Sequence, residues 1–394
     1  MKLELRKRGA KGFTSWGISV EENTVTTWTD PEKPQQKDHG APWKAMQAAG
    51  KEIRKKMLAG FFFAKPEAEG IVYDGAFKQS AEVFDFHPFG ASIAVAQIND
   101  DARGAEIVLV DLATGDRRTV VTFPADAGQT FLHTIRFDAS GERLFVALNS
   151  DTLAVTVAGG AVERLTTPSF AMNGQLFEGA SMVQSDHARR RFTAQDGDDL
   201  VVRDDQGKTL LRRDARHASR DYHCVRLSPS GRLLALQIRG NAPDKKNVIE
   251  LWSVDEGKLL RTLDIRKQAP ADPPYDTVER AVFADDEKTL LFTFVPGDRG
   301  FFALPLDGAT PCRELTSKVH TYGSLVRDLR LEGQTLAVAG ESDVRFFRWP
   351  ELELLGAAEE DIARGRAVRF SDDGRLVGSG NSWGRVVVRK AVRG

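Results

Sequence analysis

Four arginines recur at matching positions in the sequence, each one residue before the last apolar residue of a strand-like run. They are Arg136, Arg226, Arg330 and Arg369. If these runs are the inner strands of a ring of sheets, one face of each strand approaches a central channel, and the guanidinium groups form a partial cationic ring that contacts an anionic ligand. In the competing interpretation, each long basic side chain pairs with an acidic neighbour between two sheets. The sequence leaves both interpretations open.

A second basic group, Lys51, Arg54, Lys55 and Lys56, lies mainly on one face of an expected helix. Residues 1–65 hold 13 Lys and Arg against 7 Asp and Glu, whereas the rest of the chain holds 42 against 49. A basic helix on a basic module suits nucleic acid or an acidic partner. Solubility alone also explains such a face. If the helix docked against the acidic remainder of the chain, its basic face would be hidden.

Other residues give little sign of catalysis or metal binding. No phosphate-binding GxxxxGK[ST], no GxSxG and no HExxH occurs in the chain. His133, His223 and His320 stand near the starts of inner strands, where they could gather a metal ion, but histidines bonded to the backbone are the simpler interpretation. We therefore expect no catalytic residue, no metal and no cofactor. The triplet Arg189-Arg190-Arg191 is expected to form a solvated turn, with an anion contact as the alternative.

The elements that must position these residues recur with a ragged period a little under fifty. Polar turns begin at residues 87, 138, 186, 228, 284, 331 and 371. Each turn stands between two short apolar runs, and two more runs generally follow, rich in β-branched and aromatic residues with alternating polarity. Four antiparallel strands per unit at this period predict propeller blades. Seven units are present, and sheets of this kind bury both faces only by stacking on one another.

The last unit, residues 366–394, contains three strand-like runs where the other units generally have four. The run IVYDGAFK, residues 71–78, precedes the first unit and belongs to none. Placed at the outer edge of the last blade, this run completes the sheet, joins the two ends of the ring and covers an exposed strand edge. We therefore predict a mainly β fold, a seven-bladed β-propeller with strand-exchange ring closure.

The body of the chain resembles the WD-repeat family over roughly residues 71–394. The likeness is clearest in residues 224–263, where Ser228-Pro229-Ser230-Gly231 and Leu251-Trp252-Ser253 stand at the places of the repeat's turn and its Trp-Asp pair. The resemblance implies a WD-repeat-like propeller.

Residues 1–65 do not follow this period. Three strand-like runs, 2–8, 13–21 and 23–29, precede a polar stretch and a helical pattern over residues 42–60, in which Trp43, Met46, Ala49, Ile53 and Met57 form the apolar face. Pro42 suits a first helical position, and Gly60 suits a helix end. A small N-terminal α+β domain is therefore expected, with residues 66–394 forming the propeller.

This front order resembles the WGR domain, a small module of poly(ADP-ribose) polymerases and many bacterial proteins that can contact DNA and other domains. The likeness rests on Phe13 and Trp16, on residues 23–28 and on residues 53–61. The name-giving Trp-Gly-Arg is replaced by Trp28-Thr29-Asp30, so a carboxylate that repels phosphate stands where an arginine would bind it. The literal Trp383-Gly384-Arg385 lies at the turn into a strand of the last unit.

These observations predict a monomeric, non-catalytic interaction scaffold in a bacterial cytoplasm, with a propeller rim that recognises a protein or peptide. Two cysteines without metal-binding spacing, no membrane-length apolar run and no signal-peptide core support that compartment. The first alternative is a nucleic-acid-binding protein that uses residues 1–65. The second is an enzyme or metal-binding propeller with a site at the channel mouth.

Overall fold

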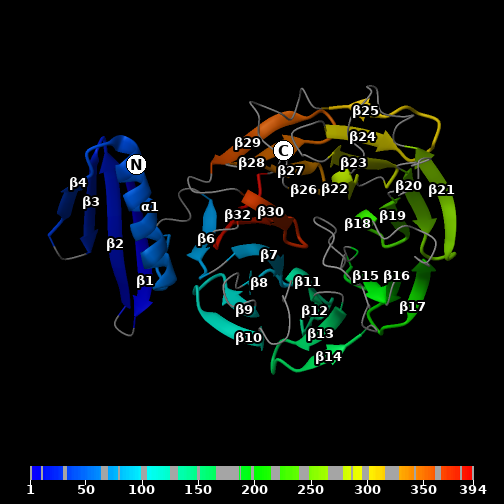
Figure 1. Ribbon diagram of the computed structural model, residues 1–394, viewed down its shortest axis with the longest axis horizontal. Helices are drawn as coiled ribbons and strands as arrows, with labels where there is room; N and C mark the ends of the chain where they lie inside the picture. The colour runs from blue at the N-terminus through cyan, green and yellow to red at the C-terminus, as the bar shows by residue number, and fades with distance from the viewer. Residues whose placement is uncertain are drawn as a thin grey trace.

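The chain is mainly β, with one α-helix among the residues that the structure describes (Figure 1). The structure is a computed structural model of all 394 residues, and the parts described here are residues 2–9, 12–29, 33–63, 70–78, 80–98, 104–124, 132–148, 151–165, 186, 188–196, 199–213, 222–238, 248–264, 278–284, 287–294, 301–315, 328–340, 343–359, 365–381 and 384–392. Within these ranges no helix is long and apolar enough to cross a membrane.

The front of the chain forms a five-stranded sheet covered by the helix. The sheet order is β4-β3-β2-β1-β5. Its elements are β1 (Lys2–Gly9), β2 (Gly12–Glu21), β3 (Thr24–Thr29), β4 (Gln35–Asp38), α1 (Pro42–Leu58) and β5 (Phe62–Phe63). The predicted strands and the turn at Glu22 and Asn23 are confirmed. Strand β4 was not predicted, because its sequence is entirely polar and its side chains are exposed.

Helix α1 begins with Pro42 at its first position, as predicted, but its apolar face is rotated from the predicted one. Ala45, Ala49, Ile53 and Met57 are buried against the sheet. The prediction that Trp43 and Met46 belong to this face is wrong, since Trp43 is 65% exposed and Met46 is 43% exposed. The i, i+4 spacing of the four buried residues forms one stripe, and Trp43 and Met46 fall beside it.

Seven further sheets follow in the chain, numbered here sheet 1 to sheet 7. Sheet 1 contains β7 (Ser80–Phe86), β8 (Ser92–Ile98), β9 (Ala105–Asp111) and β10 (Arg117–Phe123). Sheet 2 contains β11 (Leu132–Phe137), β12 (Arg143–Leu148), β13 (Asp151–Thr156) and β14 (Val162–Arg164). Sheet 3 contains β15 (Arg191–Asp196), β16 (Asp199–Asp204) and β17 (Thr209–Arg213). The first strand expected for this third unit lies outside the described residues.

The later sheets repeat the same antiparallel order. Sheet 4 contains β18 (Tyr222–Leu227), β19 (Leu233–Ile238), β20 (Val248–Ser253) and β21 (Lys258–Asp264). Sheet 5 contains β22 (Val278–Phe283), β23 (Thr289–Phe294), β24 (Phe301–Pro305) and β25 (Arg313–Glu314). Sheet 6 contains β26 (Asp328–Glu332), β27 (Thr335–Ala339), β28 (Asp343–Arg348) and β29 (Glu353–Glu359). Sheet 7 contains β30 (Gly365–Phe370), β31 (Leu376–Asn381), β32 (Arg385–Lys390) and β6 (Ile71–Ala76).

The predicted partner of the last unit is in place, because β6 pairs antiparallel with β32. Arg385 reinforces the pairing with two hydrogen bonds to Asp74, Nε to Oδ1 at 3.0 Å and Nη2 to Oδ2 at 2.7 Å. From sheet 1, Arg117 donates to the Ala76 carbonyl at 2.6 Å and to the Tyr73 hydroxyl at 2.7 Å. Residues more than 300 positions apart are thus joined edge to edge.

The recurring turns between the first two strands of each unit share one backbone feature. Their last residue has a positive φ in every unit: Gly90, Gly141, Arg189, Gly231, Glu287, Gly333 and Gly374. Glycine adopts this left-handed conformation without strain, whereas a residue with a Cβ is disfavoured there by about 1–2 kcal/mol. Arg189 and Glu287 therefore hold strained positions that glycine occupies in the other five turns.

The apolar core lies between neighbouring sheets, and each buried cluster joins consecutive sheets. One of these clusters joins sheet 7 to sheet 1, where Phe84 and Phe86 pack with Val386 and Val388. Gly378 and Gly380 permit this approach, since a Cβ at Gly380 would stand 2.3 Å from the Ala81 carbonyl oxygen. Figure 1 shows the seven sheets arranged around a common centre, with the first strands innermost.

The front sheet and α1 dock on the outer strand of sheet 7. Ile71, Ala76 and Val387 share one buried apolar cluster with Ile53 and Met57 of the helix. Arg54 adds a 3.4 Å hydrogen bond from Nη2 to the Lys78 carbonyl. Strand β6 therefore contacts two bodies at once, sheet 7 along its edge and the front module on its face.

Candidate functional site

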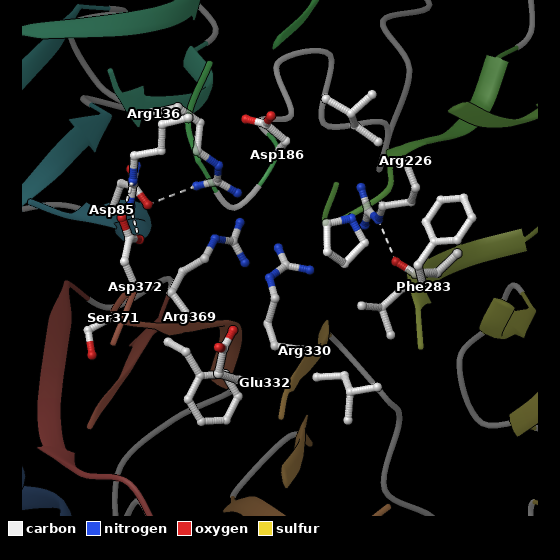
Figure 2. Close-up of a pocket in the computed structure, with 17 residues that line it drawn as sticks. Asp85, Arg136, Asp186, Arg226, Phe283, Arg330, Glu332, Arg369, Ser371 and Asp372 are labelled. Atoms are coloured by element: carbon white, nitrogen blue, oxygen red, sulfur yellow. Dashed lines mark hydrogen bonds and ion pairs between the residues drawn. The ribbon is translucent and has the colours of Figure 1, made fainter. Parts of the chain in front are cut away.

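A pocket of about 150 Å³ opens at the centre of the seven sheets, where the first strands end (Figure 2). Residues from all seven sheets and their turns line it: Asp85, Arg136, Asp186, Arg189, Arg226, Leu227, Pro229, Ala281, Val282, Phe283, Arg330, Leu331, Glu332, Arg369, Phe370, Ser371 and Asp372. We call it the central pocket. All four arginines singled out in the sequence are among its lining residues.

The four pocket arginines, Arg136, Arg226, Arg330 and Arg369, adopt one repeated side-chain geometry. In each, Nη1 donates to the carbonyl oxygen of the preceding residue, at distances of 3.0, 3.0, 2.7 and 2.7 Å. This shared bond bends each side chain back over its own strand. Figure 2 shows the four guanidinium groups converging on the same space from different sides.

Two buried aspartates sit among the arginines and bridge adjacent sheets. Asp85 of sheet 1 accepts the Phe137 backbone N–H at 2.9 Å and lies 3.4 Å from Nη1 of Arg136. Asp328 of sheet 6 accepts the Val368 N–H at 3.1 Å and an Nη1–H of Arg369 at 2.6 Å. Pairing with an acidic neighbour, the competing interpretation of these arginines, is therefore present for Arg136, Arg369 and also Arg330, which lies 3.2 Å from Asp328.

The electrostatics show that this pairing does not neutralise the arginines. Burial lowers the pKa of Arg136 to about 9, and repulsion from Arg369 contributes more than the attraction of Asp85. Burial and repulsion from Arg369 likewise hold the pKa of Arg330 far below its ordinary value. Burial opposes ionisation of Asp328, but Arg330 and Arg369 outweigh it and lower its pKa. The lowered pKa values of Arg136 and Arg330 therefore reflect burial and the mutual repulsion of cations in a confined space, which a bound anion would relieve.

Several guanidinium donors face the pocket without a protein acceptor among the described residues. The hydrogen bonds and ion pairs of Arg136, Arg330 and Arg369 use Nη1, which leaves Nη2 of each available. Nε of Arg369 is buried and also has no acceptor there. A buried donor without a partner is unfavourable, which applies to Nε of Arg369, and a bound oxyanion could accept from it and from the Nη2 groups.

Arg189 is the site residue that the sequence misplaced. Instead of being solvated, its side chain is 5% exposed and lines the pocket. It donates two 2.7 Å bonds to Asp372 of sheet 7, one bond to Asp85, and one each to the Phe86 and Phe137 carbonyl oxygens. Burial opposes its charge, but Asp85 and Asp372 outweigh burial and raise its pKa.

The other two units described at this position carry no arginine. Asp85 of sheet 1 and Val282 of sheet 5 occupy the places of the arginines in their own strands. The corresponding residue of the third unit lies outside the described residues. Arginines thus occupy this place in four of the six units described there, and Asp85 instead contacts Arg136 of the second unit and Arg189 of the third.

The basic residues of α1 do not form one patch. Lys51 and Lys55 are exposed, whereas Arg54 turns to the Lys78 carbonyl. The Lys56 ammonium lies 5.4 Å from the ring centres of both Trp16 and Phe61, a cation–π arrangement within the front module. Two of the four predicted contacts are thus available to a ligand.

We expect the helix to make at most two contacts with nucleic-acid phosphates. Changing both Lys51 and Lys55 to Glu should then alter the slope of log affinity against log salt by about two units or less, measured by filter retention of duplex DNA on the full chain. Lys390→Glu, an exposed change on β32, is the matched control. A larger change in slope would mean that the helix leads a broader nucleic-acid surface.

Metal binding finds no support in the described part of the chain, where no group of three or more His, Cys, Asp or Glu is placed to hold an ion. The side chains of His133, His223 and His320 lie outside the described residues. Cys312 is buried in the core between sheets 4 and 5, and burial raises the pKa of its thiol to about 12.

Two comparisons with known proteins found no match for this chain. No protein-family model matches the chain, and no curated protein matches its sequence. What the chain does must therefore be inferred from the central pocket and its surroundings.

Proposed function

We propose that this protein is a non-catalytic interaction scaffold that binds an acidic group of a protein or peptide partner in the central pocket. The convergence of Arg136, Arg226, Arg330 and Arg369 from four different sheets carries the proposal. Guanidinium groups bind carboxylates through paired, charge-assisted hydrogen bonds, and the strands around the pocket hold these groups on a rigid frame. Phe89, which is 74% exposed in the turn after β7, offers an apolar contact at the same rim.

The architecture that we propose is a closed seven-bladed β-propeller of the WD-repeat type, comprising residues 66–394. Three observations support it: the pairing of β6 with β32, the buried clusters that join every sheet to the next, and the cluster that joins sheet 7 to sheet 1. A ring leaves no unpaired end, so the central pocket is lined on all sides by rigid strands.

The front module, residues 1–65, is proposed to be a WGR-like domain that supports the scaffold. Its apolar contacts with Ile71, Ala76 and Val387 attach it to the strand that completes sheet 7. Asp30 replaces the arginine of the WGR motif, and two of the four basic helix residues are engaged within the protein. Contact with another protein domain therefore accounts for the module better than binding to DNA.

Affinity isolation from the native cell followed by mass spectrometry tests this function. The full chain should retain a partner that Arg330→Gln loses by at least about tenfold, since one charge-assisted hydrogen bond contributes about 1.5–3 kcal/mol. Arg375→Gln is the control, because Arg375 lies in the turn of sheet 7 and its side chain is 77% exposed. A set of partners that all bind Arg330→Gln normally would overturn the proposal.

A further inference from the structure

Charged side chains of both signs line the central pocket. The four pocket arginines are accompanied by two buried aspartates, Asp85 and Asp328. Asp186 and Glu332 also line the pocket, and Arg189 is bonded to Asp372 through two bonds of 2.7 Å and to Asp85. Asp186 is itself held by the backbone N–H groups of Arg190 and Arg191. An anion is thus attracted to the part of the pocket where the four arginines converge.

The arginines approach the centre of the pocket from several directions (Figure 2). A carboxylate presents two oxygens in one plane, so it can face two guanidinium groups at most in a paired geometry. A tetrahedral oxyanion presents three outer oxygens around an axis and carries up to two negative charges. The available Nη2 groups of Arg136, Arg330 and Arg369, together with Nε of Arg369, match the second arrangement.

We propose that the central pocket binds a compact dianionic oxyanion, the phosphate group of a phosphorylated side chain on the partner. This inference rests on the proposed function and specifies the chemistry of the group that enters. A volume of about 150 Å³ accommodates one such group with its ester oxygen.

Calorimetric titration of the full chain with small probes tests the proposal. Sulfate and O-phosphoserine should each bind at one site, and acetate should bind at least about tenfold more weakly because it carries one charge and two oxygens. Arg330→Gln should weaken sulfate binding by about tenfold or more. Arg375→Gln should leave it unchanged. Acetate binding as tightly as sulfate, or equal sulfate binding by both variants, would overturn the proposal.

Measuring the affinity at several pH values distinguishes the effect of the ligand's charge from the effect of the protein's charges. The second ionisation of a phosphate ester has a pKa near 6, so binding of O-phosphoserine should fall about tenfold between pH 7.5 and pH 5, while sulfate stays dianionic and should bind equally at both. The titratable and charged groups that face the pocket act on both probes alike: Asp85, Asp186, Asp328, Glu332, Asp372, His87 and the five arginines. If sulfate and O-phosphoserine both bind more weakly at pH 5 by the same factor, the result would contradict a phosphate site.

The two proposals fail differently. A partner whose capture depends on Arg330 but is not displaced by sulfate or O-phosphoserine would support the scaffold and overturn the phosphate inference. If sulfate binds specifically but no partner depends on Arg330, the oxyanion site would be supported and the scaffold function would be overturned. Comparing a captured partner peptide in its phosphorylated and unphosphorylated forms then distinguishes a bound side chain from free phosphate, since only the former requires the peptide.

Discussion

Arg189→Gly is expected to lower the free energy of unfolding by about 3–5 kcal/mol, the range for removing one partner of a buried ion pair. The variant loses five hydrogen bonds that tie the third unit to sheets 1, 2 and 7. Asp85 then keeps the Phe137 N–H and a 3.4 Å contact with Arg136 but loses its closest cation, and Asp372 loses its paired donors. Urea unfolding followed by tryptophan fluorescence measures the change.

Glycine is the informative substitution at this position because the backbone of Arg189 has φ 54°, and five of the matching turns carry glycine there. The change removes the guanidinium group and relieves backbone strain, so any loss of stability comes from the lost side-chain contacts. Arg190→Ala is the matched control, since Arg190 is exposed in the same triplet and should change stability by no more than about 0.5 kcal/mol. Equal stability of the two variants would show that the buried contacts contribute nothing.

The cost of Arg189→Gly should shrink in acid. Burial opposes the ionisation of Asp85, but Arg189 and Arg136 outweigh it and hold its pKa below the ordinary 3.8. A carboxyl group whose pKa is depressed in the folded state stabilises the protein above the unfolded pKa, and that contribution disappears as the pH falls through the folded value. The difference between wild type and variant should therefore be largest above about pH 5 and decrease below pH 4. A constant difference would contradict this account.

Asp74→Ala should be the second large effect, a loss of about 2–3 kcal/mol. Asp74 is buried and accepts hydrogen bonds from Nε and Nη2 of Arg385, so its removal breaks both bonds where β6 pairs with β32. Because β6 also carries the front module, weakening this pairing should loosen both contacts. Denaturant unfolding and hydrogen exchange of β6 measure this, with protection falling most at Val72 and Tyr73.

Asp74→Asn separates charge from shape at the same position. The amide keeps one acceptor of similar size, so we expect this variant to recover about half of the loss. If Asp74→Ala leaves the exchange of β6 unchanged, then the strand is held by its ladder and by the front module, and the Arg385 pair plays no part in holding it.

Sequence alone determined much of the repeating architecture of this protein. Short alternating runs and turn residues are local signals, so the antiparallel sheets followed from them, and the single unassigned run before the first unit identified β6 as the partner of β32. The pocket arginines were also visible, because a residue at a fixed place in a strand occupies the same place in every sheet of a repeat. In the folded chain they line one pocket and three of them pair with aspartates, whereas anion binding by them stays a prediction.

The tertiary structure decided what depends on residues far apart in the chain. Arg189 looked like part of a solvated turn, yet its partner Asp372 is 183 residues away and no local pattern connects them. Trp43 and Met46 fit a helical apolar stripe in the sequence, but the sheet packs against the side of α1 that carries Ala45, so Ala45 is buried and the other two are exposed. Local periodicity specifies which way a side chain points, whereas burial and charge pairing depend on what lies opposite, and only the folded chain brings those groups together.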